Sequence, residues 1–146
     1  MTDALKHFLV GHGFDGANLD GTVEYGLTPL MRAALAGRLE LVQELLELGA
    51  GVDRVNMDGN NALWLACVSG KAEIVRRLVL AGIDIDHQNE TGATALMYTA
   101  SSGKSDLVAL LLELGANPHI ENVDGARAGD MASTLGCLRL LRHTVV

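Results

Sequence analysis

The feature that most constrains this chain is a sequence period of 33 residues. The segment from Gly59 to Gly70 has counterparts that begin at Gly26 and Gly92, with small, apolar and glycine residues at matching positions. A fixed period of about 20 to 50 residues is typical of solenoids, because each unit buries its apolar face only by stacking on a neighbour. The sequence therefore predicts a stack of similar units.

Each unit carries the signals of a short helix followed by a second, more apolar helix. Thr28 or Thr94 can cap the first helix through its hydroxyl, and Pro29 suits a first helical position. A glycine then ends this helix in a left-handed conformation. The second helix has apolar residues at i, i+1, i+4 and i+5, which face the core. These residues are Leu41, Val42, Leu45 and Leu46, then Ile74, Val75, Leu78 and Val79, then Leu107, Val108, Leu111 and Leu112.

The period of 33, with Gly-x-Thr-Pro-Leu at 26–30 and Leu-Leu-x-x-Gly-Ala at 45–50, resembles the ankyrin repeat. We expect an all-α fold, an ankyrin-repeat solenoid of stacked helix-turn-helix units with hairpin loops, forming one domain. The inner helices are thin and the outer helices bulky, so the stack should curve and leave the inner helices and hairpin loops on a concave side. The expected parts are an N-terminal capping helix and loop at 1–22, full repeats at 23–55, 56–88 and 89–121, and a degenerate C-terminal capping repeat at 122–146.

The two ends depart from the repeat. Residues 2–10 are typical of an amphipathic helix capped by Thr2, with an apolar face that begins at Leu5. In the last unit Gly129 replaces the leucine of the inner helix. Because glycine costs about 1 kcal/mol in a helix interior, we expect this helix to begin late, near Asp130.

The hairpin tips should begin at Asn56, Asn89 and Asn122. An asparagine side chain can accept hydrogen bonds from the backbone of the turn, and the glycine that follows can adopt a positive φ. We interpret these asparagines as structural residues.

Composition argues against two classes of partner, nucleic acids and membranes. The formal net charge is −7, and no run of cations is longer than Arg76-Arg77, so binding to a phosphate backbone is not expected. The N-terminus lacks the pattern of a signal peptide, and no apolar stretch approaches the length of a membrane span. We expect a cytoplasmic monomer that binds neither nucleic acid nor membrane.

The sequence offers little for catalysis. The five histidines form no pair at the spacing of a zinc site, and Cys67 and Cys137 have no partner spacing for a metal or a disulfide. A Gly-x-Gly-x-x-Gly string at 11–16 follows a helix, not a strand, so it does not indicate a nucleotide site. We predict no catalytic, cofactor-binding or metal-binding residues, no cofactor, and two buried, reduced cysteines.

In ankyrin-repeat proteins the surface that recognises other proteins is formed by hairpin tips and the exposed side of the inner helices. Carried over position by position, the resemblance implies ten partner-binding residues here. They are Tyr25, Leu27, Met57, Asp58, Asn60, Trp64, Val68, Glu90, Thr91 and Ser101.

A row of large side chains, Met31, Trp64 and Met97, recurs at one position of the inner helices. Such residues can anchor a partner, or they can pack between neighbouring inner helices. The sequence leaves both possibilities open.

The resemblance implies a non-enzymatic protein–protein interaction module that binds a protein partner through its concave face, as an adaptor, an inhibitor or an assembly factor. One alternative is a structural subunit of a homo-oligomer. Another is a metal-dependent enzyme with a His/Asp site in the loops.

Overall fold

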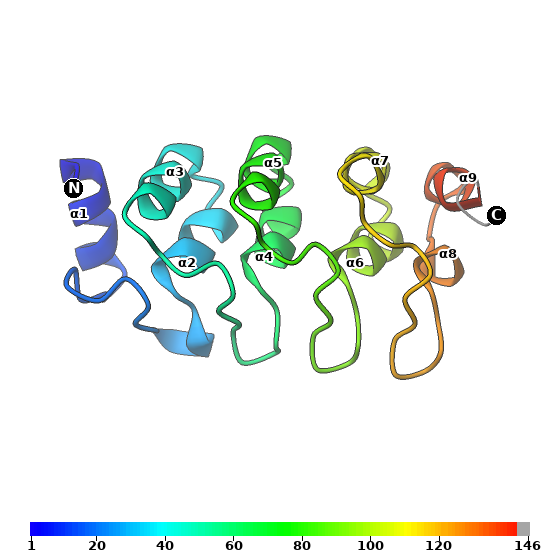
Figure 1. Ribbon diagram of the computed structural model, residues 1–146, viewed down its shortest axis with the longest axis horizontal. Coiled ribbons are helices and arrows are strands. Elements are labelled where there is room, and N and C mark those ends of the chain that lie inside the picture. Colours follow the sequence, from blue (N-terminus) through cyan, green and yellow to red (C-terminus); the bar gives the residue numbers. More distant parts are fainter. Residues whose placement is uncertain (143–146) are drawn as a thin grey trace. The chain divides into compact units, whose positions relative to one another are not determined.

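The computed structural model describes residues 1–142, and its regular elements in that range are helices, with one isolated bridge between Val23 and Leu27 (Figure 1). The all-α prediction is confirmed. His143 and the last three residues of the expected capping repeat lie outside the described residues. The elements are α1 (Asp3–Gly11), the 3-10 turn η1 (Glu24–Gly26), α2 (Pro29–Leu35), α3 (Leu39–Glu47), α4 (Ala62–Ser69), α5 (Ala72–Leu80), α6 (Ala95–Ser101), α7 (Ser105–Glu113), α8 (Ala128–Met131) and α9 (Leu135–Arg142).

The contacts between elements divide the chain into two compact units, Met1–Ile83 and Asp84–Val146, called unit 1 and unit 2 below. In unit 1 the inner helix α2 packs on α3 and on the next inner helix α4, α4 packs on α5, and α1 packs on α3. In unit 2 the inner helix α6 packs on α7 and α8, and α9 packs on α7 and α8. Helix pairs therefore stack within each unit, as the period predicts. The exact repeat boundaries stay a prediction.

The inner helices begin at side-chain caps. The side-chain oxygens of Thr28, Asn61 and Thr94 each accept a hydrogen bond from the amide three residues later, at 3.2, 3.3 and 3.2 Å. The predicted caps at Thr28 and Thr94 are confirmed, and Asn61 acts in the same way on α4. Each such cap stabilises its helix by about 1 kcal/mol, because it satisfies an amide that has no partner inside the helix.

The core lies between the inner and outer helices of each unit. Leu41, Val42 and Leu45 of α3 are at most 1% exposed, and their counterparts in α5 are fully buried. Burial of one such side chain contributes about 1.5–3 kcal/mol, so these rows account for much of the stability. The small inner residues Ala33 and Ala34 are also fully buried, which lets neighbouring helices approach closely.

The N-terminal helix α1 forms as the sequence predicts. The hydroxyl of Thr2 accepts a hydrogen bond from the amide of Leu5 at 3.2 Å, and Leu5, Phe8 and Leu9 are buried. Thr2 also donates its amide and its hydroxyl to the carboxylate of Glu44 on α3, with the amide bond at 2.7 Å. The start of α1 is therefore tied to α3.

In unit 2, α8 includes Gly129, so the expectation of a late start near Asp130 is wrong. The carboxylate of Asp130 accepts a hydrogen bond from the amide of Arg127 at 2.9 Å, which closes the first turn ahead of the glycine. Gly129 therefore lies in the first turn of a four-residue helix, and the cost of glycine in a helix interior does not apply there.

Candidate functional site

Two adjacent hairpin tips in unit 1 present exposed apolar side chains. Tyr25 is 65% exposed and Met57 is 68% exposed. The amide of Met57 donates to the carbonyl of Tyr25 at 3.0 Å, so the two tips are joined through their backbones. Gly26 allows this approach, because it has φ of +72° and a Cβ there would lie 3.2 Å from the amide nitrogen of Met57.

Tyr25 itself has an unusual backbone. Its φ is 65°, and it is the one non-glycine residue with positive φ in the described part of the chain. The left-handed conformation costs a residue with a Cβ roughly 1–2 kcal/mol. The corresponding tip residues Asp58 and Thr91 avoid this cost, so the first tip is a strained exception.

Asparagine organises the other tips, as the sequence predicts. In unit 1, Oδ1 of Asn56 accepts hydrogen bonds from the amides of Asp58 and Asn60, both at 3.0 Å. Asp58 is exposed beside Met57, so this turn holds both side chains at the surface.

Two of the ten proposed residues are not at the surface. Leu27 is 4% exposed and Asn60 is 7% exposed, so the expectation that they form part of a partner-facing surface is wrong. Each residue lies between its hairpin tip and the inner helix that follows. The carbonyl of Leu27 accepts a hydrogen bond from the amide of Val23, and the carbonyl of Asn60 accepts one from the amide of Asn56, which closes each tip. Their side chains turn into the packing of the unit instead of toward solvent.

The row of large inner-helix residues is packed and does not form a ladder of exposed anchors. Met31 and Met97 are each 1% exposed, so the packing interpretation holds for both. Trp64 is half-buried, and Val68, one turn later on α4, is 39% exposed. In unit 1 the inner-helix part of the proposed surface therefore consists of Trp64 and Val68.

In unit 2 the proposed residues Glu90, Thr91 and Ser101 are exposed. Oδ1 of Asn89 accepts from the amides of Thr91 and Ala93, both at 3.0 Å, which holds this tip.

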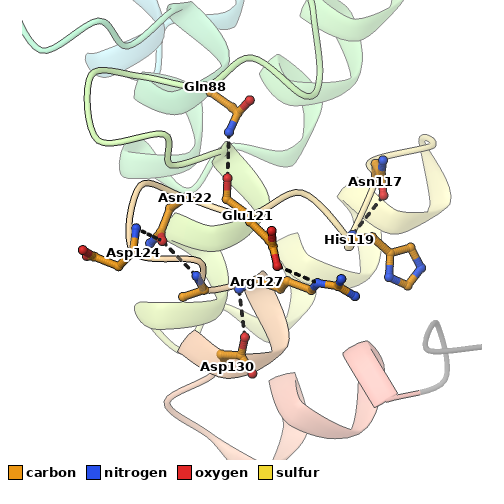
Figure 2. Close-up of polar contacts among 9 residues, drawn as sticks. Gln88, Asn117, His119, Glu121, Asn122, Asp124, Arg127 and Asp130 are labelled. Atoms are coloured by element: carbon orange, nitrogen blue, oxygen red, sulfur yellow. Dashed lines mark hydrogen bonds and ion pairs between the residues drawn. The ribbon is translucent and has the colours of Figure 1, made fainter.

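The last hairpin of unit 2 carries several polar contacts (Figure 2). Gln88 Nε2 donates to the carbonyl of Glu121 at 3.0 Å, and the Glu121 carboxylate lies 3.8 Å from Nε of Arg127. Asn122 Oδ1 accepts from the amide of Asp124 at 2.9 Å. These contacts join the connector to the tip and satisfy backbone groups, so we interpret them as structural.

One pocket of unit 1 was not anticipated from the sequence. We call it the Arg32 pocket; it has a volume of about 270 Å³ and is lined by Gly11, His12, Val23, Glu24, Tyr25, Leu27 and Arg32. Nε of Arg32 donates to Nδ1 of His12 at 3.2 Å, although the two residues are 20 positions apart. Burial, and next the charge of Arg32, lower the pKa of His12 below its ordinary value. Both effects favour the neutral form of His12.

Metal-binding side chains do not cluster in the described part of the chain. Within residues 1–142, no three His, Cys, Asp or Glu side chains are placed to share a metal ion. Cys67 and Cys137 are buried and not joined in a disulfide, as expected. Over the same residues, no helix combines the length and the apolar character that crossing a membrane requires.

Comparison with known proteins places this arrangement in a family. The family model described as ankyrin repeats, in three copies, matches residues 1–89 and 48–122. Together these matches run from residue 1 to residue 122 of the 146 residues. A comparison with curated protein sequences found no match.

Proposed function

The chain belongs to the ankyrin-repeat family, and from this membership we propose that it binds a protein partner through its hairpin tips and the exposed side of its inner helices. Ankyrin repeats are in general protein–protein interaction modules. We propose further that the role is non-enzymatic and that the free chain is a cytoplasmic monomer, acting as an adaptor, an inhibitor or an assembly factor.

The observation that supports this proposal best is the pair formed by Tyr25 and Met57. Both side chains are about two-thirds exposed, at 65% and 68%, while the frame beneath them is buried. Tyrosine offers a large, rigid contact area, and methionine adapts its shape to a partner. The backbone hydrogen bond between their tips holds the pair before binding, so recognition need not include a large ordering cost.

The rest of the proposed surface consists of other residues of the hairpin tips and inner helices. In unit 1 it includes Asp58, Trp64 and Val68. In unit 2 it includes Glu90, Thr91 and Ser101. Tyr25, Asp58 and Thr91 share one repeat position and differ in chemistry, whereas the core positions of the outer helices are apolar in each repeat.

The test is affinity capture from native lysate with the immobilised chain, followed by quantification of each retained protein. The double substitution Tyr25→Ala and Met57→Ala should lower recovery of the specific partner about tenfold or more, since central aromatic anchors dominate interface energies. Thermal unfolding should change little, because both side chains are exposed.

The matched control is Leu80→Ala. Leu80 is an equally apolar and more exposed residue, at 78%, on the outer helix α5, away from the hairpin tips. It should leave partner recovery unchanged. If the wild type and the Tyr25/Met57 double variant recovered equal amounts of the partner, the proposed surface would be wrong.

A further inference from the structure

The Arg32 pocket combines a small cavity with a charged side chain, Arg32, that has a histidine as its hydrogen-bond partner. Its volume of about 270 Å³ lies below the roughly 300–1,000 Å³ of small-molecule sites, so its size suits a single side chain of a bound protein. It opens between the end of α1, the first hairpin and α2, and the exposed Tyr25 forms part of its wall. The pocket therefore adjoins the surface proposed above for partner binding.

The guanidinium of Arg32 carries a positive charge into this pocket, and no carboxylate of residues 1–142 lies within ion-pair distance of it. Arg32 is half-buried, and among residues 1–142 its side chain forms no ion pair and donates one hydrogen bond, from Nε to His12. A partly desolvated charge is costly when it lacks a counter-charge. The planar group matches a carboxylate, which accepts two parallel hydrogen bonds from it.

His12 is arranged to assist as a second donor. Its ring packs against Phe8, with 4.5 Å between the ring centroids, and its Nδ1 accepts from Arg32. A neutral imidazole that accepts at Nδ1 carries its proton on Nε2. His12 can therefore donate to an anion, and its contact with Nε holds the guanidinium of Arg32 in place.

We propose that the Arg32 pocket receives the carboxylate side chain of an aspartate or glutamate of the protein partner, bound by Arg32 and assisted by His12. The inference rests on the proposed function, and it specifies the chemistry of one partner residue. Glu24 also lines the pocket and places a like charge near the bound carboxylate. Removal of the Glu24 charge should therefore strengthen binding, and removal of the Arg32 charge should abolish it.

The test is an NMR titration at pH 7 with capped glutamate, acetyl-Glu-N-methylamide, at constant ionic strength. We expect saturable shifts of the Arg32 Nε–H and His12 ring signals. Capped glutamine, which has nearly the same shape and no charge, should produce no saturable shift. At saturation with capped glutamate the pKa of His12 should rise, because a nearby carboxylate favours the imidazolium form.

Three substitutions test whether the NMR shifts come from binding in the Arg32 pocket. Arg32→Gln should lose the saturable shift of His12, since a charge-assisted ion pair commonly changes affinity tenfold or more. Arg38→Gln is the matched control, because Arg38 lies in the same unit and already pairs with Glu40 at 2.6 Å. Glu24→Gln should bind capped glutamate severalfold more tightly, and it serves as the deciding variant if Arg32→Gln does not fold.

The contrary outcomes are equally definite. The proposal fails if capped glutamine shifts the signals as capped glutamate does, if Arg32→Gln folds and keeps the saturable shift, or if Glu24→Gln does not tighten binding. It also fails if acetate binds and capped glutamate does not, because the pocket would then hold small free anions. None of these results changes the capture experiment with Tyr25 and Met57, so the wider function is judged separately.

Discussion

At the scale of single residues, one side-chain oxygen organises each later hairpin tip. Oδ1 of Asn89 accepts the amides of Thr91 and Ala93, both at 3.0 Å. Asn89→Ala should therefore reduce the free energy of unfolding by about 1–2 kcal/mol, because two backbone donors lose their acceptor. Urea denaturation measures the change.

Asn89→Asp is the matched variant, since a carboxylate offers the same acceptor at the same place. It should remain within about 0.5 kcal/mol of the wild type. If the alanine and aspartate variants unfolded at the same urea concentration, the turn would not depend on this oxygen.

At the scale of elements, the position of α1 depends on Glu44 of α3. The hydrogen bond from the Thr2 side chain, and then the one from the Thr2 amide, lower the pKa of Glu44 below its ordinary value of 4.5. A lowered folded-state pKa means that the contribution to stability is complete above pH 4.5 and is lost as the pH falls through the folded value. Denaturation between pH 7 and pH 3 should show a steeper acid loss for wild type than for Glu44→Gln.

Glu47 provides the control for this prediction, because it lies on the same helix and is exposed. Glu47→Gln should keep the acid dependence of the wild type. An identical pH profile for Glu44→Gln and wild type would show that Thr2 is not held by this carboxylate.

At the scale of the whole molecule, the chain consists of two compact units, each with its own core. Leu78 in unit 1 and Leu111 in unit 2 occupy the same repeat position, and both are fully buried. Truncation of either to alanine should cost about 2–5 kcal/mol, because a cavity replaces a buried side chain. Repeat proteins do not always unfold as a single cooperative block.

Native-state hydrogen exchange distinguishes the two units. Leu111→Ala should lower amide protection mainly in Asp84–Val146, and Leu78→Ala mainly in Met1–Ile83. A uniform loss across the whole chain in both variants would mean that the units unfold together.

The features predicted correctly from the sequence are those that act over a few residues. The cap at Thr94 and the turn at Asn122 each depend on an acceptor and on amides two to four positions away. Such contacts follow from residue type and spacing. The late start expected for α8 was wrong because the cost of Gly129 depends on its place within the helix, and the Asp130 contact sets that place.

The prediction that Leu27 and Asn60 are exposed was wrong for a different reason. Leu27 and Asn60 share one repeat position that we expected at the surface, yet both are buried, and Ala93 at the same position of unit 2 is buried as well. Which of several adjacent side chains stays exposed depends on neighbours that are distant in the sequence. The exposure of Tyr25 and Met57 and the burial of Met31 also depend on such distant neighbours, so the sequence did not predict them.

The sequence by itself determined the all-α stack, its caps and its hairpin turns, because a 33-residue period and local hydrogen bonds are properties of the chain alone. Only the tertiary structure decided which tip residues are accessible and that His12 meets Arg32. The contact between His12 and Arg32 forms where the end of α1 meets α2, and a contact across 20 residues leaves no local pattern in the sequence.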